Sequence, residues 1–99
     1  MTSFEEELAF AKLAKAAIEG KLTEQAIKVL REATRIAVEQ VVFSGEGPLR
    51  DSRNNIGFLL PPVTEVPEGQ QEQDDIDNAK SAIDFWIQEL EDSLLFHRL

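Results

Sequence analysis

DIDNAKSAIDFWIQELEDSLLFH, which spans residues 75–97, carries the clearest structural signal in this chain. Its apolar residues recur every three or four positions, the spacing that gathers side chains on one face of an α-helix. They are Ile76, Ala79, Ile83, Trp86, Ile87, Leu90 and Leu94. Asp74 and Asp75 suit the start of a helix, because negative charge is favourable at the positive end of the helix dipole. We therefore predict a helix over residues 75–97.

Two apolar patterns of the same kind precede it, over residues 4–19 and 24–43. A capping box at Ser3 and the three glutamates of the first turn, residues 5–7, open the first pattern, and we interpret those glutamates as solvated. A glycine ends this pattern, and Thr23 is a good N-cap for the second. Since only a few residues separate the two patterns, we predict a tight helical hairpin.

The connection between the hairpin and the last helix, residues 44–73, is interrupted by glycine and proline. The interruptions are Gly45, Gly47, Pro48, Pro61, Pro62, Pro67 and Gly69. They predict a long irregular loop. Within it, residues 51–60 form either a short helix capped by Asp51 or an extended piece that docks on the bundle.

These elements define an all-α fold in a single domain of 99 residues: a helical hairpin plus a third long helix after a long irregular loop. The apolar faces of the first two helices are wide for so short a chain. A chain of this size has a thin stability margin, which oligomerisation often widens. We therefore expect homo-oligomerisation, with a dimer favoured, to complete a bundle of four or more helices.

The composition argues against several classes of partner. A formal net charge of -9 opposes direct binding of nucleic acid, which relies on clustered lysine and arginine. No apolar run approaches the roughly 20 residues of a membrane-spanning helix, so we expect no membrane contact. The sequence has no cysteine and shows no signal-peptide pattern at its start, and the cytoplasm is the expected location.

We predict no catalytic residues, no metal site and no cofactor, and hence a protein that is not an enzyme. His97 is the only histidine, and no nucleophile or second metal ligand stands at a suitable spacing from it. The carboxylates from Asp75 onward do not form a calcium loop, because Lys80 and Trp86 occupy the positions of the glycine and the bidentate glutamate. Residues 44–48 are rich in glycine but lack the lysine of a phosphate-binding loop.

The candidate partner-binding residues are a polar cluster followed by an apolar pair. They are Arg50, Asp51, Arg53, Asn54, Asn55, Phe58 and Leu59. The arginines offer forked donors to an acidic group, and the apolar pair offers an anchor. A solvated turn is the simpler interpretation of the same residues.

Self-association is assigned to the apolar face of the last helix. The residues concerned are Trp86, Leu90, Leu94 and Phe96. Trp86 fits the core of one copy as well as it fits a subunit interface.

The sequence thus indicates a non-enzymatic, acidic protein-interaction module of the adaptor, regulator or inhibitor type, acting through self-association and its long loop. The support for this interpretation is the missing catalytic constellation, the acidic charge and the length of the loop. The alternative is a helical bundle that binds a small molecule in a pocket near Trp86, Arg50 and Arg53.

Overall fold

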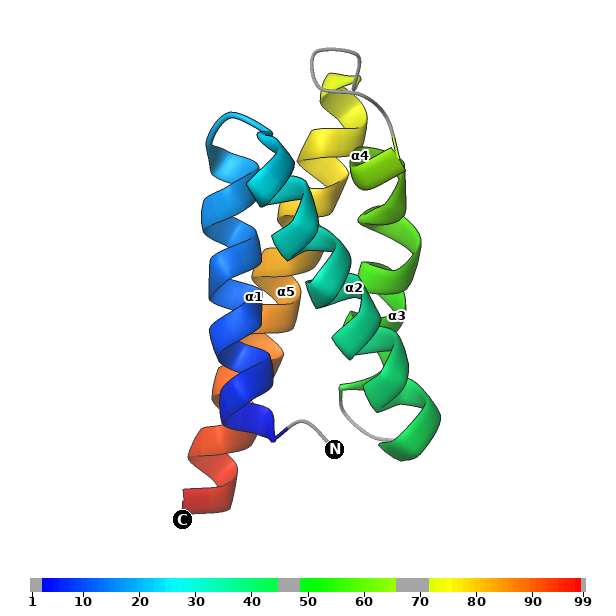
Figure 1. Cartoon of the computed structure of the whole chain (residues 1–99). Coiled ribbons are helices and arrows are strands. Elements are labelled where there is room, and N and C mark those ends of the chain that lie inside the picture. Colours follow the sequence, from blue (N-terminus) through cyan, green and yellow to red (C-terminus); the bar gives the residue numbers. More distant parts are fainter. Residues whose placement is uncertain (1–2, 45–48, 66–71, 99) are drawn as a thin grey trace.

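The structure is a computed structural model, and it describes residues 3–44, 49–65 and 72–98 (Figure 1). In these ranges the chain forms five helices and no strand. The helices are α1 (Phe4–Glu19), α2 (Glu24–Ser44), α3 (Arg50–Leu59), α4 (Pro61–Glu65) and α5 (Gln73–Arg98). The predicted all-α fold is confirmed.

Two N-caps build the helical hairpin of α1 and α2. The Ser3 hydroxyl accepts a hydrogen bond from the Glu6 backbone N–H at 3.2 Å. The Thr23 hydroxyl accepts one from the Ala26 backbone N–H at 3.1 Å. Both bonds satisfy donors that have no acceptor within the first turn of a helix. The short connection between the end of α1 and the start of α2, residues 20–23, returns α2 along α1 (Figure 1).

The prediction of an irregular loop over residues 44–73 is wrong for much of that segment, which contains α3 and α4. Pro61 and Pro62 begin α4. Proline is tolerated in the first turn of a helix, because the N–H that it lacks has no intrahelical acceptor there. The Arg31 guanidinium on α2 holds α4 in place by donating to the Thr64 carbonyl oxygen at 3.1 Å.

Of the two alternatives for residues 51–60, the helix is the one that forms, as α3. Leu49, rather than Asp51, occupies its N-cap position, and no side chain caps it with a hydrogen bond. Two parts of the predicted loop, residues 45–48 and 66–71, lie outside the described residues.

The fourth long helix of the bundle is α3, which packs against both α2 and α5. Its Ile56 is fully buried, as are Leu30 of α2 and Ile83 of α5. From the sequence we expected homo-oligomerisation to complete a bundle of four or more helices; the described residues of one copy already form four long helices, and the association itself stays a prediction. The radius of gyration is 13.0 Å, the value of a folded chain of about 100 residues. One copy therefore encloses this core.

Candidate functional site

A buried carboxylate joins the four long helices. Glu7 of α1 has no exposed surface, and its carboxylate accepts four hydrogen bonds. Its Oε1 accepts from Gln40 Nε2 at 3.1 Å and from Arg53 Nη2 at 2.8 Å. Its Oε2 accepts from Arg53 Nε at 2.9 Å and from Trp86 Nε1 at 2.7 Å. The three donor residues lie on α2, α3 and α5, and we call the four residues the Glu7 network.

The Glu7 network is closed to further ligands. A carboxylate has about four acceptor positions, and the four donors occupy all of them. Arg53 is only 3% exposed, and its guanidinium also lies over the Phe4 ring, 5.6 Å from the ring centre. Among the described residues, no buried side-chain nitrogen or oxygen lacks a hydrogen-bond partner. A network satisfied in this way fixes helices against one another.

Three residues that the sequence indicated for surface contacts are inside the protein. Arg53, predicted to bind a partner, uses its guanidinium to bind Glu7. Trp86 and Leu90, predicted to mediate self-association, have no exposed surface in one copy of the chain. α3 packs against α5 and adds to the core that contains Trp86 and Leu90.

The interpretation of Glu7 as part of a solvated turn is also wrong. Glu7 shares the buried face of α1 with Ala11, Ala14 and Ile18, at spacings of four, three and four residues. This is the spacing of one helical face, so the pattern does contain a signal for the burial of Glu7. A charge at such a position requires an opposite charge on the facing helices, and Arg53 supplies it.

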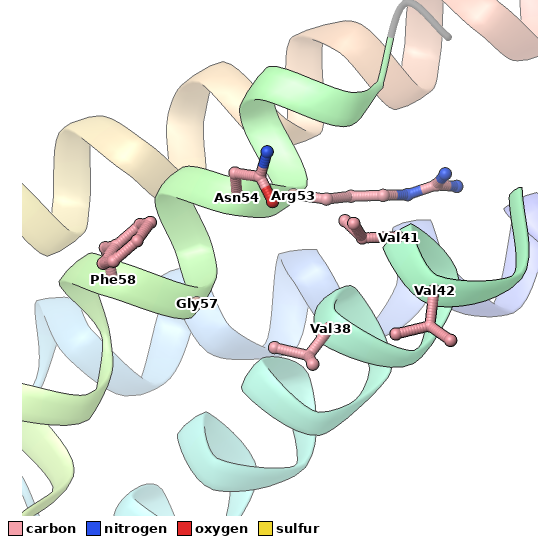
Figure 2. Close-up of a pocket in the computed structure, with 7 residues that line it drawn as sticks. All are labelled: Val38, Val41, Val42, Arg53, Asn54, Gly57 and Phe58. Carbon is pink, nitrogen blue, oxygen red and sulfur yellow. The ribbon is translucent and has the colours of Figure 1, made fainter. Parts of the chain in front are cut away.

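A hollow lies between α2 and α3, and Figure 2 shows the side chains around it. Its volume is about 220 Å³. Its lining is Val38, Val41 and Val42 from α2, and Arg53, Asn54, Gly57 and Phe58 from α3. Phe58 is 78% exposed, Val42 is 73% exposed and Val38 is 47% exposed. We call this site the α2/α3 hollow. Apolar side chains grouped around a concave site are typical of a binding surface.

Gly57 keeps the α2/α3 hollow open. Glycine inside a helix costs roughly 0.5–1 kcal/mol relative to alanine, so its place within α3 needs a reason. A Cβ atom on Gly57 would lie 3.3 Å from Cγ2 of Val38, which is tighter than an ordinary contact. The missing side chain thus allows α3 to approach α2 and leaves space in the hollow.

The other predicted partner-binding residues on α3 fall into two groups. Asn54 and Phe58 line the α2/α3 hollow. Arg50, Asp51 and Asn55 are exposed on the same helix but do not line the hollow. Only part of the predicted cluster is therefore brought together with an apolar anchor.

The remaining predicted contact residues lie at the ends of α3 and α5. Leu59 is half-buried and packs against the core, and Leu94 is half-buried as well. Phe96 is 77% exposed, and Leu95, which is not among the predicted contact residues, is 62% exposed. The last turns of α5 project beyond the other helices (Figure 1), which explains this exposure.

Charged residues on α2 flank Val38 in the sequence. Arg35 donates from its Nε to Glu32 at 3.1 Å and forms an ion pair with Glu39. The hydrogen bond from Arg35 is the main cause that lowers the pKa of Glu32 below its ordinary value of 4.5. Slight burial opposes this shift, and the positive charge of Arg35 adds to it.

Replacing Arg35 with glutamine is expected to raise the pKa of Glu32 toward 4.5. Because folding lowers this pKa, the pair stabilises the fold above about pH 4.5, and the stabilisation is lost as the pH falls through the lower folded-state value. The pair is exposed, so solvent screening keeps its contribution to stability small. Titration of the Glu32 side-chain carboxyl by NMR in both proteins measures the change. An unchanged midpoint would show that the hydrogen bond does not form in solution.

Among the described residues, neither a metal site nor a membrane-spanning helix is found. The described residues contain no group of three or more metal-ligating side chains placed to hold an ion. In the same ranges, no helix combines the length and the apolar character that crossing a bilayer requires.

Comparison with known proteins finds no family model, no curated protein and no solved structure that matches this chain.

Proposed function

We propose that this protein is a non-enzymatic interaction module that binds an apolar segment of a protein at the α2/α3 hollow. The observation that carries the proposal is the exposure of Val38, Val42 and Phe58 around one concave site, in a chain of net charge -9. Apolar surface in water is unfavourable, and a group of such side chains around a hollow commonly marks a contact with another protein. Adaptors, regulators and inhibitors are the types of protein that work through such a surface.

The shape of the site favours a helical segment as the ligand. α2 and α3 pack against each other, and the hollow lies between them (Figure 2). Two packed helices offer a groove into which an amphipathic helix lays its apolar face. One large apolar side chain of the ligand enters the hollow beside Val41 and Gly57, and the Asn54 amide offers a donor and an acceptor to its polar side.

Binding of a small molecule has less support. Sites for small molecules usually measure roughly 300–1,000 Å³ and place several polar groups around the ligand. The α2/α3 hollow measures about 220 Å³, and its polar lining is limited to Arg53 and Asn54. Arg53 is already bound to Glu7, and Trp86 does not line the hollow. One side chain of a protein fits this space better than a metabolite does.

A displayed library of amphipathic helical peptides, each with one aromatic residue on its apolar face, tests the proposal. Selection on the wild-type protein is expected to yield helical peptides. Their affinity for V42E and for F58E is expected to be at least about tenfold lower than their affinity for the wild type. Each substitution places a charge where the apolar contact forms, and a charge without a partner is costly to bury. Both side chains are largely exposed, so neither substitution disturbs the core. Fluorescence anisotropy of the labelled peptides measures the affinities.

L13E is the matched control. It adds the same charge at an apolar residue that is 52% exposed on α1 and does not line the hollow. The selected peptides are expected to bind L13E as tightly as the wild type, and to shift the NMR signals of the Val38 and Val41 methyl groups. The proposal fails if no peptide is selected, or if the selected peptides bind all three variants equally.

A further inference from the structure

We propose that the α2/α3 hollow is occupied by a second copy of this chain, which inserts its Phe58 there and receives the Phe58 of the first copy. This inference rests on the function proposed above and adds the identity of the ligand. A two-fold symmetric contact uses the same patch on both subunits, so that patch must be complementary to itself. The evidence is that the α2/α3 surface carries a projecting ring and a hollow side by side.

Phe58 is the projecting element of this patch. It is 78% exposed, and it borders the hollow that Val38 and Val42 also line. Figure 2 shows Phe58 and Val42 on opposite sides of the hollow, with Val38 between them in this view. Because Phe58 lines the hollow of its own copy, a ring inserted from a second copy comes to lie against it. The two Phe58 rings then form an aromatic pair close to the symmetry axis.

The volume of the hollow fits one aromatic ring. An apolar cavity of about 150 Å³ is large enough to bind benzene, and the α2/α3 hollow measures about 220 Å³. The space depends on Gly57, since a side chain there would crowd Val38. The valine side chains supply an apolar wall that makes no demand for hydrogen bonds from the inserted ring.

The dimer that this contact forms is weak and reversible. Two buried aromatic rings account for roughly 300–500 Å² of surface. The adjoining valines add to this area, but the sum stays near or below the roughly 1,200 Å² of a long-lived complex. Each copy also carries a net charge of -9, so the two copies repel each other at low ionic strength. Salt screens this repulsion, and the dimer is therefore tighter at high salt.

The end of α5 is the competing apolar element. Leu95 and Phe96 are exposed there, at 62% and 77%. Insertion of this end into a neighbour's hollow joins two different surfaces, which gives open chains of copies unless the rotation between them closes a ring. A Phe58 exchange closes at two copies, so the stoichiometry and the sensitive residue distinguish the two arrangements.

Sedimentation velocity over a protein concentration range of about 10 µM to 1 mM, at about 0.05 and 0.5 M NaCl, tests the exchange. The wild type is expected to show a reversible monomer–dimer equilibrium with a Kd within that range and tighter association at the higher salt. F58E and F58K are each expected to weaken the dimer at least about tenfold. L13E is the control and is expected to match the wild type. Circular dichroism of every variant verifies that the fold is retained.

An equal mixture of F58E and F58K provides the decisive result. In the symmetric dimer the two copies of residue 58 face each other, so the mixture places a glutamate opposite a lysine. We expect it to associate at least about tenfold more tightly than either variant alone at the lower salt. A contact that does not bring the two positions together gives no such recovery.

Several outcomes overturn the exchange. The exchange is wrong if the wild type stays monomeric at both salt concentrations, or if F58E does not weaken the dimer. It is also wrong if the mixture of F58E and F58K associates no more tightly than either variant alone. Association that is lost in L95E and kept in F58E assigns the contact to the end of α5 instead. If the wild type is monomeric but binds the selected peptides through the hollow, the exchange is wrong while the proposed function stands. If no selected peptide binds the wild type more tightly than it binds V42E and F58E, the proposed function itself is wrong.

Discussion

Replacing Glu7 with alanine is expected to lower the free energy of unfolding by about 3–5 kcal/mol. The substitution removes the carboxylate that neutralises Arg53, which is 3% exposed and therefore remains charged in the protein interior. It also removes the acceptor of the Gln40 amide and of the Trp86 indole N–H. Urea denaturation followed by far-UV circular dichroism measures the loss.

Glu6→Ala is the matched control, because the Glu6 side chain is exposed in the same turn of α1. It is expected to cost less than about 1 kcal/mol, as most exposed substitutions do. Glu7→Gln keeps an acceptor oxygen but loses the charge, so its stability is expected to fall between those of the wild type and Glu7→Ala. If Glu7→Ala costs no more than Glu6→Ala, the Glu7 network does not hold the helices together.

Replacing Trp86 with alanine is expected to cost about 3–5 kcal/mol. Trp86 is the largest of the fully buried side chains, so its removal leaves a cavity at the centre of the bundle. The loss of its N–H donor to Glu7 adds to the cost of the cavity. Thermal and urea unfolding followed by circular dichroism measure the effect, since the chain has no other tryptophan to report by fluorescence.

Trp86→Phe separates the two contributions. It retains much of the ring volume but has no N–H group, and we expect a smaller loss of about 1–3 kcal/mol. Phe85→Ala is the control for an aromatic residue of the same helix, because Phe85 is 39% exposed and leaves no enclosed cavity. A Trp86→Ala variant no less stable than Phe85→Ala would mean that the core does not centre on Trp86.

Three helices could be predicted from the sequence because local signals and periodicity agree in them. Ser3 and Thr23 mark the starts of α1 and α2 and form the capping bonds that their residue types predict. The apolar residues of the last helix recur at helical spacing around Trp86, and each of them is buried or half-buried in α5. In these segments the spacing of apolar residues decides both the element and the face that it buries.

The same rules did not predict α4, and they left a helix over residues 51–60 as one of two alternatives. Pro61 and Pro62 normally indicate the end of regular structure, but here they stand in the first turn of a helix. α3 has few apolar residues, and its buried positions include Ser52 and Arg53. Which polar side chains of such a helix face the core depends on what the neighbouring helices offer them, and that information is not local.

The candidate site was predictable only in its apolar part. Phe58 was selected as an anchor beside polar residues, and it does border a hollow. The other side of that hollow comes from Val38 and Val42, which are consecutive on one face of α2 and were assigned to no contact. Only the packing of α2 against α3 shows that these residues meet.

The Glu7 network also constrains how the chain acquires its structure during synthesis. Glu7 and Trp86 are 79 positions apart. At roughly 5–20 residues per second, the ribosome delivers the last donor about 4–16 s after the carboxylate. Throughout this interval Glu7 lacks at least one of its native donors, and Arg53, which follows Glu7 by 46 positions, is synthesised before Trp86. The Glu7 network is therefore complete only after α5 has been synthesised as far as Trp86, and until then α1 and α3 lack the packing partner that α5 supplies.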